Sequence, residues 1–169
     1  MTNVIDLTLN ELANKIKSKE ISSTEVTSAY VERSKSSKKL NTYIEETFEQ
    51  ALKNANKFDN KPNFEKKLPG IPLAVKDLFC THNVRTTAGS KILENFIPTY
   101  ESTVTQNLWD AGAILLGKLN CDEFAMGSSN ETSHFGNVIN PIDNNLVPGG
   151  SSGGSASALA AKLTPATIG

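Results

Sequence analysis

The segment from Pro148 to Ala161, PGGSSGGSASALAA, carries the clearest chemical pattern in the sequence. Glycines on both sides of Ser151 and Ser152 give the backbone conformations closed to other residues, so hydroxyls and amides can approach a ligand closely. The small, helix-forming residues that follow place this loop at a helix N-terminus, where unpaired N–H groups face electronegative atoms. A flexible linker is the alternative, but a linker does not pass directly into Ala-Ser-Ala-Leu-Ala-Ala. The pattern therefore predicts a binding or catalytic loop.

Lys76 is a second candidate for chemistry, because it directly follows the apolar run from Ile71 to Val75. A lysine accepts a proton only in its uncharged form, and burial in apolar surroundings favours that form. The local sequence leaves two interpretations open. Lys76 is either a base at the end of a buried strand or an ordinary lysine that extends its ammonium group into solvent.

The loop of Pro148 to Ala161 and the segment from Gly117 to Ser129, GKLNCDEFAMGSS, together resemble the amidase signature family, serine hydrolases with a Ser–Ser–Lys triad. The second segment resembles one branch in particular, the glutaminase subunits of tRNA-dependent amidotransferases. The resemblance extends from about Leu7 to Gly169. It departs from the family at Cys121, where methionine is usual, and we interpret this exchange as a change in packing. The implied fold is α/β, a mixed sheet sandwiched between helices.

The resemblance also implies roles for individual residues. Lys76 would be the catalytic base, and Ser151 the bridging serine that passes a proton from the nucleophile to the lysine. The family pattern implies a cis peptide bond between Gly150 and Ser151. Gly127 and Ser128 match the loop that lies against bound substrate in relatives, and a simple turn is an equally good interpretation of them. Two further serines are interpreted as hydrogen-bonding residues of the loop: Ser152 and Ser155.

The nucleophile of the family is expected beyond this sequence. In relatives the nucleophilic serine and the oxyanion hole follow shortly after the position of Gly169, and the glutamine-binding residues lie further along. We therefore expect the 169 residues to be an N-terminal fragment that does not support acyl transfer alone. The implied reaction of the complete protein is glutamine hydrolysis, which supplies ammonia for converting Glu-tRNA(Gln) to Gln-tRNA(Gln). A free-standing amidase and a catalytically inert fragment remain the alternatives.

The resemblance implies partners and no cofactor in this subunit. A B subunit would use ATP and magnesium to activate glutamyl-tRNA(Gln), and a small C subunit would help to join the other two. The net charge of −1 gives no field that attracts nucleic acid, so the B subunit would make most phosphate contacts. No membrane span, signal peptide or transit peptide is evident, and Cys80 and Cys121 form no Cys-x-x-Cys pattern. We therefore expect a cytoplasmic protein without membrane contact.

Three other classes of site fit the sequence less well. Residues 150–154 satisfy the Gly-x-Ser-x-Gly pattern of α/β-hydrolases, but that fold needs an acid and then a histidine after the serine. Both histidines, His82 and His134, precede it. No Gly-Lys-Ser/Thr closes a phosphate-binding loop, and the separated histidines without clustered cysteines predict no zinc site. We expect both histidines in surface or turn positions.

Helical periodicity dominates the first part of the chain. Capping boxes predict helices that begin after Thr8 and Ser22, and a third helix is predicted around Phe48 to Ala55. We expect these helices to form a layer on a more apolar core, with a partner-binding face as the alternative. Residues 1–67 hold 12 basic and 10 acidic side chains, against 5 and 8 in residues 68–169.

The second part of the chain has the pattern of a buried sheet. Apolar runs at 71–75 and 113–117 predict strands. Residues 102–111 predict a helix with Val104, Leu108 and Ala111 facing inward and Gly112 at its C-terminal end. Alternation of helices with buried strands indicates an α/β sheet. We therefore predict a helical layer over residues 1–67 and the N-terminal part of the α/β core over 68–169, together one incomplete domain.

Overall fold

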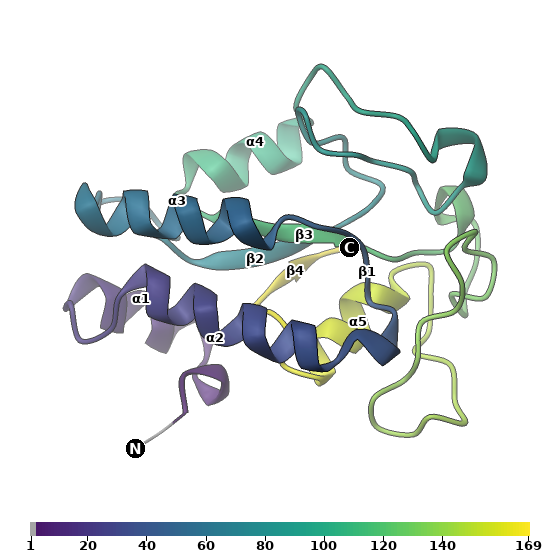
Figure 1. Cartoon of the computed structure of the whole chain (residues 1–169), viewed down its shortest axis with the longest axis horizontal. Coiled ribbons are helices and arrows are strands. Elements are labelled where there is room, and N and C mark those ends of the chain that lie inside the picture. Colours follow the sequence, from purple (N-terminus) through teal and green to yellow (C-terminus); the bar gives the residue numbers. More distant parts are fainter. Residues whose placement is uncertain (1–2) are drawn as a thin grey trace.

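A computed structural model describes residues 3–169 and contains a four-stranded mixed sheet with helices packed against it (Figure 1). The strands are β1 (Tyr43–Glu46), β2 (Pro72–Lys76), β3 (Ile114–Leu119) and β4 (Thr167–Ile168). Their order is β1-β3-β2-β4, in which β2 is parallel to β3 and β4 while β1 is antiparallel to β3. The predicted α/β class is confirmed, as are both predicted strands.

The α-helices of the described residues are α1 (Leu9–Lys17), α2 (Ser23–Ser36), α3 (Phe48–Asn60), α4 (Thr103–Asp110) and α5 (Gly153–Ala160). Short 3₁₀ turns lie at Val4–Asp6, Lys38–Leu40, Lys91–Leu93 and Glu123–Ala125. Across residues 3–169 no helix combines the length and apolar character needed to cross a bilayer.

Both predicted capping boxes are present. Thr8 Oγ1 accepts a hydrogen bond from the Glu11 amide at 3.3 Å, and the Glu11 carboxylate accepts one from the Thr8 amide at 2.7 Å. Ser22 and Glu25 exchange the same two bonds at 3.1 and 2.7 Å. Each box satisfies N–H groups that the first turn of a helix leaves unpaired, and so fixes where α1 and α2 begin.

The beginning of α2 is also tied to α3 by a side chain. The Asp59 carboxylate accepts hydrogen bonds from the Ser23 and Thr24 amides, each at 2.9 Å, and from the Thr24 hydroxyl at 2.6 Å. An anion at this position also compensates the positive end of the α2 dipole. The two helices therefore meet through a defined polar contact as well as through apolar packing.

Apolar side chains from the helices and the strands form one core. Helical residues facing it include Leu12, Ile16, Val26, Tyr30 and Ala51, and strand residues include Ala74, Ile114 and Leu116. Ala158 of α5 and Leu163 belong to the same cluster. The predicted helical layer thus packs onto the apolar strands, and this core supports β2, which carries Lys76 at its end.

Strand β1 was not predicted. It lies within the range 1–67, which was predicted as a helical layer, so the described part of that range, residues 3–67, is not wholly helical. It pairs with β3 in a register that places Tyr43 opposite Leu119, Glu45 opposite Lys118 and Glu46 opposite Gly117, with an irregularity at Ile44. None of its four residues is fully buried, so the segment lacks the alternation by which a strand is recognised in sequence.

The prediction that Val104 faces inward is wrong. Its side chain is 41% exposed, whereas Thr105 is fully buried in α4. The Thr105 hydroxyl donates to the Cys80 carbonyl at 3.3 Å, and this bond lets a polar side chain occupy the inner position. The predicted end of this helix is confirmed, since Gly112 follows it with φ of +97°.

Candidate active site

Lys76 lies at the end of β2 with only 4% of its surface exposed. Its Nζ donates to Ser151 Oγ at 2.7 Å and to Ser152 Oγ at 2.8 Å. The structure therefore brings together the two residues that the sequence singled out, although 75 positions separate them. It also shows that the lysine does not extend into solvent. Ser152 was interpreted only as a hydrogen-bonding residue of its loop, and it is a second partner of Lys76.

The loop that carries both serines has a defined backbone. The Gly150–Ser151 peptide bond is cis, and Gly149 has φ of +82°, in the left-handed region that favours glycine. The Ser151 carbonyl accepts a hydrogen bond from the Asp122 amide at 3.1 Å. Helix α5 begins at Gly153 with Ser152 as its N-cap residue, so the predicted position of the loop at a helix N-terminus is confirmed.

The buried carboxylate of Asp122 organises the neighbouring loop, which contains Gly127 and Ser128. It accepts hydrogen bonds from the Asn130 amide at 3.0 Å and from the Thr132 amide and hydroxyl at 3.3 and 2.8 Å. Burial acts to raise the pKa of Asp122, but the hydrogen bonds, above all from the Thr132 hydroxyl, hold it below the usual value. Sequence reasoning did not single out Asp122, because its partners and the glycines on it come from later loops.

Two glycines pack directly on this carboxylate. A Cβ atom on Gly127 would lie 2.3 Å from Asp122 Cγ, and a Cβ on Gly150 would lie 2.2 Å from Asp122 Oδ2. The position of the Gly150 Cβ would also be 2.6 Å from the Ser129 amide nitrogen. Only glycine leaves room for these approaches, and they bring the loop of Gly127 and Ser128 against the residue that precedes Ser151.

Gly127 and Ser128 are both exposed, beside the serine loop. The packing of Gly127 on Asp122 gives a structural reason for a glycine there. The exposed backbone next to Gly150 remains open to a ligand. Substrate contact by Gly127 and Ser128 stays a prediction.

The last described residue also lies at this site. β4 pairs with β2 so that Thr167 is opposite Ala74 and Ile168 is opposite Val75. A Cβ on Gly169 would lie 2.9 Å from both Cβ and Oγ of Ser152. The backbone at Gly169 is therefore in contact with the serine that shares Lys76 with Ser151.

The prediction that Ser155 is a hydrogen-bonding residue of the loop is wrong, because its buried Oγ has no hydrogen-bond partner within residues 3–169. It lies close to the last residue of the chain, since a Cβ on Gly169 would be 3.2 Å from Ser155 Oγ.

The remaining candidate residues do not gather at this site. Cys121 is fully buried, its thiol forms no disulfide, and burial raises its pKa to about 12, as expected of a packing residue. His82 and His134 are exposed, as predicted. Within residues 3–169, histidine, cysteine and acidic side chains form no group of three placed to hold a metal ion.

Comparison with known proteins gives matches over nearly the whole chain. The family model described as Amidase matches residues 25–169. The A subunit of glutamyl-tRNA(Gln) amidotransferase from Pelagibacter ubique is 70% identical over 100% of this chain and 35% of the relative. The corresponding protein of Hyphomonas neptunium is 55% identical over 96% of this chain and 35% of the relative. The chain thus spans about 35% of the length of these curated relatives.

Solved structures share the arrangement of elements. The A subunit of glutamyl-tRNA(Gln) amidotransferase from Thermotoga maritima superposes with a TM-score of 0.77 at 34% identity, covering 97% of this chain and 34% of that one. Fatty acid amide hydrolase superposes with a TM-score of 0.92 at 26% identity, covering 98% of this chain and 30% of that one. The mixed sheet and its helices are therefore common to these proteins.

Proposed function

This chain belongs to the amidase family, and we propose that it supplies the base and the relay serine of a glutaminase site in a tRNA-dependent amidotransferase. The observation that carries the proposal is the contact of 2.7 Å between Lys76 Nζ and Ser151 Oγ. A buried amine next to a hydroxyl is the arrangement needed to move a proton out of a nucleophile.

In this proposal Lys76 and Ser151 act as one unit. With the amine uncharged, Ser151 passes its proton to Nζ while it takes the proton of the attacking serine. The nucleophile then bonds to the amide carbon of glutamine, and the same relay returns a proton to the departing nitrogen, which leaves as ammonia. Water hydrolyses the resulting acyl-enzyme to glutamate. Ser152 contributes a second hydrogen bond that holds Nζ in place.

We propose that the nucleophilic serine and the oxyanion hole come from a segment after Gly169. The contact of Gly169 with Ser152 and the pairing of β4 with β2 support this, because they direct the chain towards Lys76. These 169 residues alone would then be inactive as an amidase. Gly127 and Ser128, exposed beside the serine loop, would contact the bound substrate.

The proposed substrate is glutamine, and the ammonia would serve the conversion of glutamyl-tRNA(Gln). Relatives at 70% and 55% identity that bear the name of this amidotransferase component support the assignment. The proposal includes B and C subunits as partners, ATP and magnesium used by the B subunit, no cofactor in this chain, and a cytoplasmic location. A free-standing amidase is the alternative, and the names of the relatives at 70% and 55% identity favour the amidotransferase over it.

The test is glutamine hydrolysis by the complete protein with its partners. Lys76→Ala and Ser151→Ala should each lower kcat by several powers of ten, because the removal of one member of a catalytic unit abolishes the function of the whole unit. Lys162→Ala, which removes an exposed ion pair with Asp6, is the control and should keep the wild-type kcat. Near-normal turnover by either folded site variant would refute the assigned role. Co-purification with B and C subunits separates the amidotransferase from a lone amidase.

A further inference from the structure

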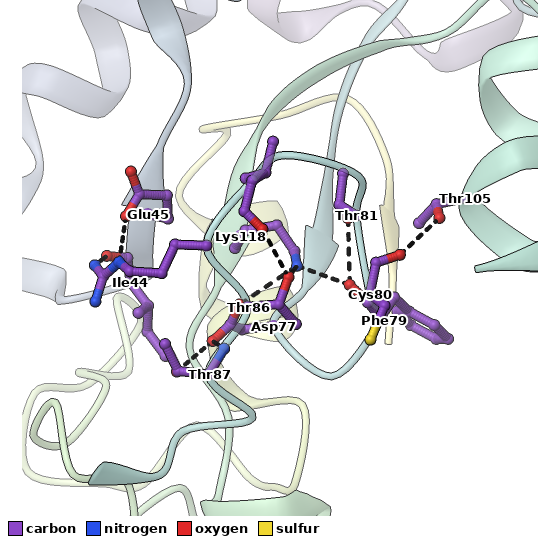
Figure 2. A network of polar contacts seen from close by, with 12 residues as sticks. Ile44, Glu45, Asp77, Phe79, Cys80, Thr81, Thr86, Thr87, Thr105 and Lys118 are labelled. Carbon is purple, nitrogen blue, oxygen red and sulfur yellow. Dashed lines mark hydrogen bonds and ion pairs between the residues drawn. The ribbon is translucent and has the colours of Figure 1, made fainter. Parts of the chain in front are cut away.

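Asp77 and Lys118 form an ion pair in which neither side chain is exposed (Figure 2). Lys118 Nζ lies 3.4 Å from Asp77 Oδ1 and donates to the Phe79 carbonyl and to Thr86 Oγ1, both at 2.7 Å. Asp77 Oδ2 accepts from the Thr87 amide at 2.8 Å and from the Thr87 hydroxyl. The three protons of the Lys118 ammonium thus have three oxygens as neighbours.

Burial of these two charges has an energetic cost. It raises the pKa of Asp77 and lowers the pKa of Lys118, and the attraction between the two groups opposes both changes. A buried ion pair often contributes no more to stability than packed apolar side chains of similar volume. Its distinctive effect is geometric, because Lys118 fixes Phe79, Thr86 and Asp77 at defined distances from one another.

The ion pair lies next to the proposed base but on the other side of the sheet. Asp77 directly follows Lys76, and consecutive residues of extended backbone project to opposite faces. In the pairing of β2 with β3, Lys118 is opposite Val75, whereas Lys76 is opposite Leu119. The Asp77 amide donates to the Leu119 carbonyl at 2.8 Å, which continues the pairing of β2 with β3 past Lys76.

We propose that Asp77 and Lys118 are positioning residues for Lys76. The ion pair and its bonds to Phe79 and Thr86 fix the turn after β2, and so set the direction from which Nζ meets Ser151. The hydrogen bonds of both side chains run to Phe79 in that turn and to Thr86 and Thr87 further along the chain. None runs to the serine loop, so the ion pair would act on Lys76 through the backbone. This inference rests on the proposed function of Lys76 as the base.

The experiment measures glutamine hydrolysis by the complete protein in its complex, for Lys118→Met, Asp77→Asn and the double variant. Each single variant should lower kcat about 100-fold with an unchanged KM for glutamine, because a small misplacement of a catalytic group has an effect of that order. The double variant leaves no unpaired buried charge and should regain thermal stability. Its kcat should stay low, because the bonds to Phe79 and Thr86 are still missing.

Leu12→Ala and Lys76→Ala distinguish a loss of stability, a failure of the positioning role and a failure of the proposed function. Leu12→Ala opens a cavity in the core at α1 and should lower the Tm without changing kcat. A double variant with wild-type kcat, or a Leu12→Ala kcat that falls in proportion to its stability, would overturn the positioning role. If a single variant does not fold, the kcat of the double variant alone tests the positioning role. Wild-type turnover by Lys76→Ala would overturn the proposed function itself, whereas an inactive Lys76→Ala beside a fully active double variant would overturn only this inference.

Discussion

At the scale of single residues, the site is a lysine shared by two serines. The local sequence left Lys76 undecided between base and surface residue, because its partner Ser151 is 75 positions away. The family resemblance assigned Lys76 as the base. Tertiary structure, and not local spacing, decides which side chain a strand-end lysine meets. For the same reason Ser152 was interpreted only as a hydrogen-bonding residue of its loop, although it also contacts Lys76. The packing of Gly127 and Gly150 on Asp122 was likewise not predicted. The contact of Lys76 with Ser151 was implied by the motifs, whereas the contact of Lys76 with Ser152 and the contacts of Asp122 were not.

The close approach of Gly150 to Asp122 gives a prediction. Gly150→Ala would place a Cβ 2.2 Å from Asp122 Oδ2 and should displace the serine loop, costing about 1–3 kcal/mol of stability and most of the glutaminase activity. Gly149→Ala is the matched control, because its Cβ meets nothing within 4 Å and only its φ of +82° is unfavourable. That strain costs about 1–2 kcal/mol. Equal kcat values for the two variants in the complete protein would contradict this explanation.

The Asp122 carboxylate predicts a dependence of stability on pH. Its pKa is lower in the folded protein, so folding favours the ionised form. The stabilisation is complete above the unfolded pKa of about 3.9 and is lost as the pH falls through the folded pKa. Asp122→Asn should therefore be less stable than wild type by about 1–3 kcal/mol at pH 7, and the difference should shrink below pH ~4. Urea unfolding of the complete protein at both pH values measures this; a constant difference would contradict it.

At the scale of elements, capping boxes and apolar spacing were sufficient for α1, α2, α3, β2 and β3. They were not sufficient for β1, whose residues are only partly buried and whose pairing depends on β3. They also misplaced the inner face of α4, because Thr105 is buried through hydrogen bonds that a hydrophobic pattern does not register. The position of α4 was therefore predictable from the sequence, whereas the side chain that it buries was not.

The polar link between α2 and α3 gives a prediction at this scale. Asp59→Ala removes three hydrogen bonds at the α2 N-terminus and a favourable interaction with the helix dipole. The free energy of unfolding should fall by about 1–2 kcal/mol. Glu32→Ala, an exposed acidic residue within α2, is the control and should change stability by less than about 0.5 kcal/mol. Urea midpoints of the complete protein compare the two, and equal shifts would show that Asp59 does not cap α2.

At the scale of the whole molecule, one core joins the helical layer to the sheet, and both support the end of β2. The division at residue 67 stays a prediction, although β1 shows that the first part also contributes to the sheet. The family and the α/β class were predictable because two long motifs specify them. The chain spans about 35% of its curated relatives, so reaction, substrate and partners rest on the proposal made above.

A double-mutant cycle on Lys76 and Ser151 tests the central claim most directly. The kcat for glutamine hydrolysis is measured in the assembled enzyme for Lys76→Ala, Ser151→Ala and the variant that combines them. If the two side chains pass one proton along a single path, the combined variant will be no slower than the slower single variant. Losses that multiply in the combined variant would contradict the account, since they would mean that the lysine and the serine act independently.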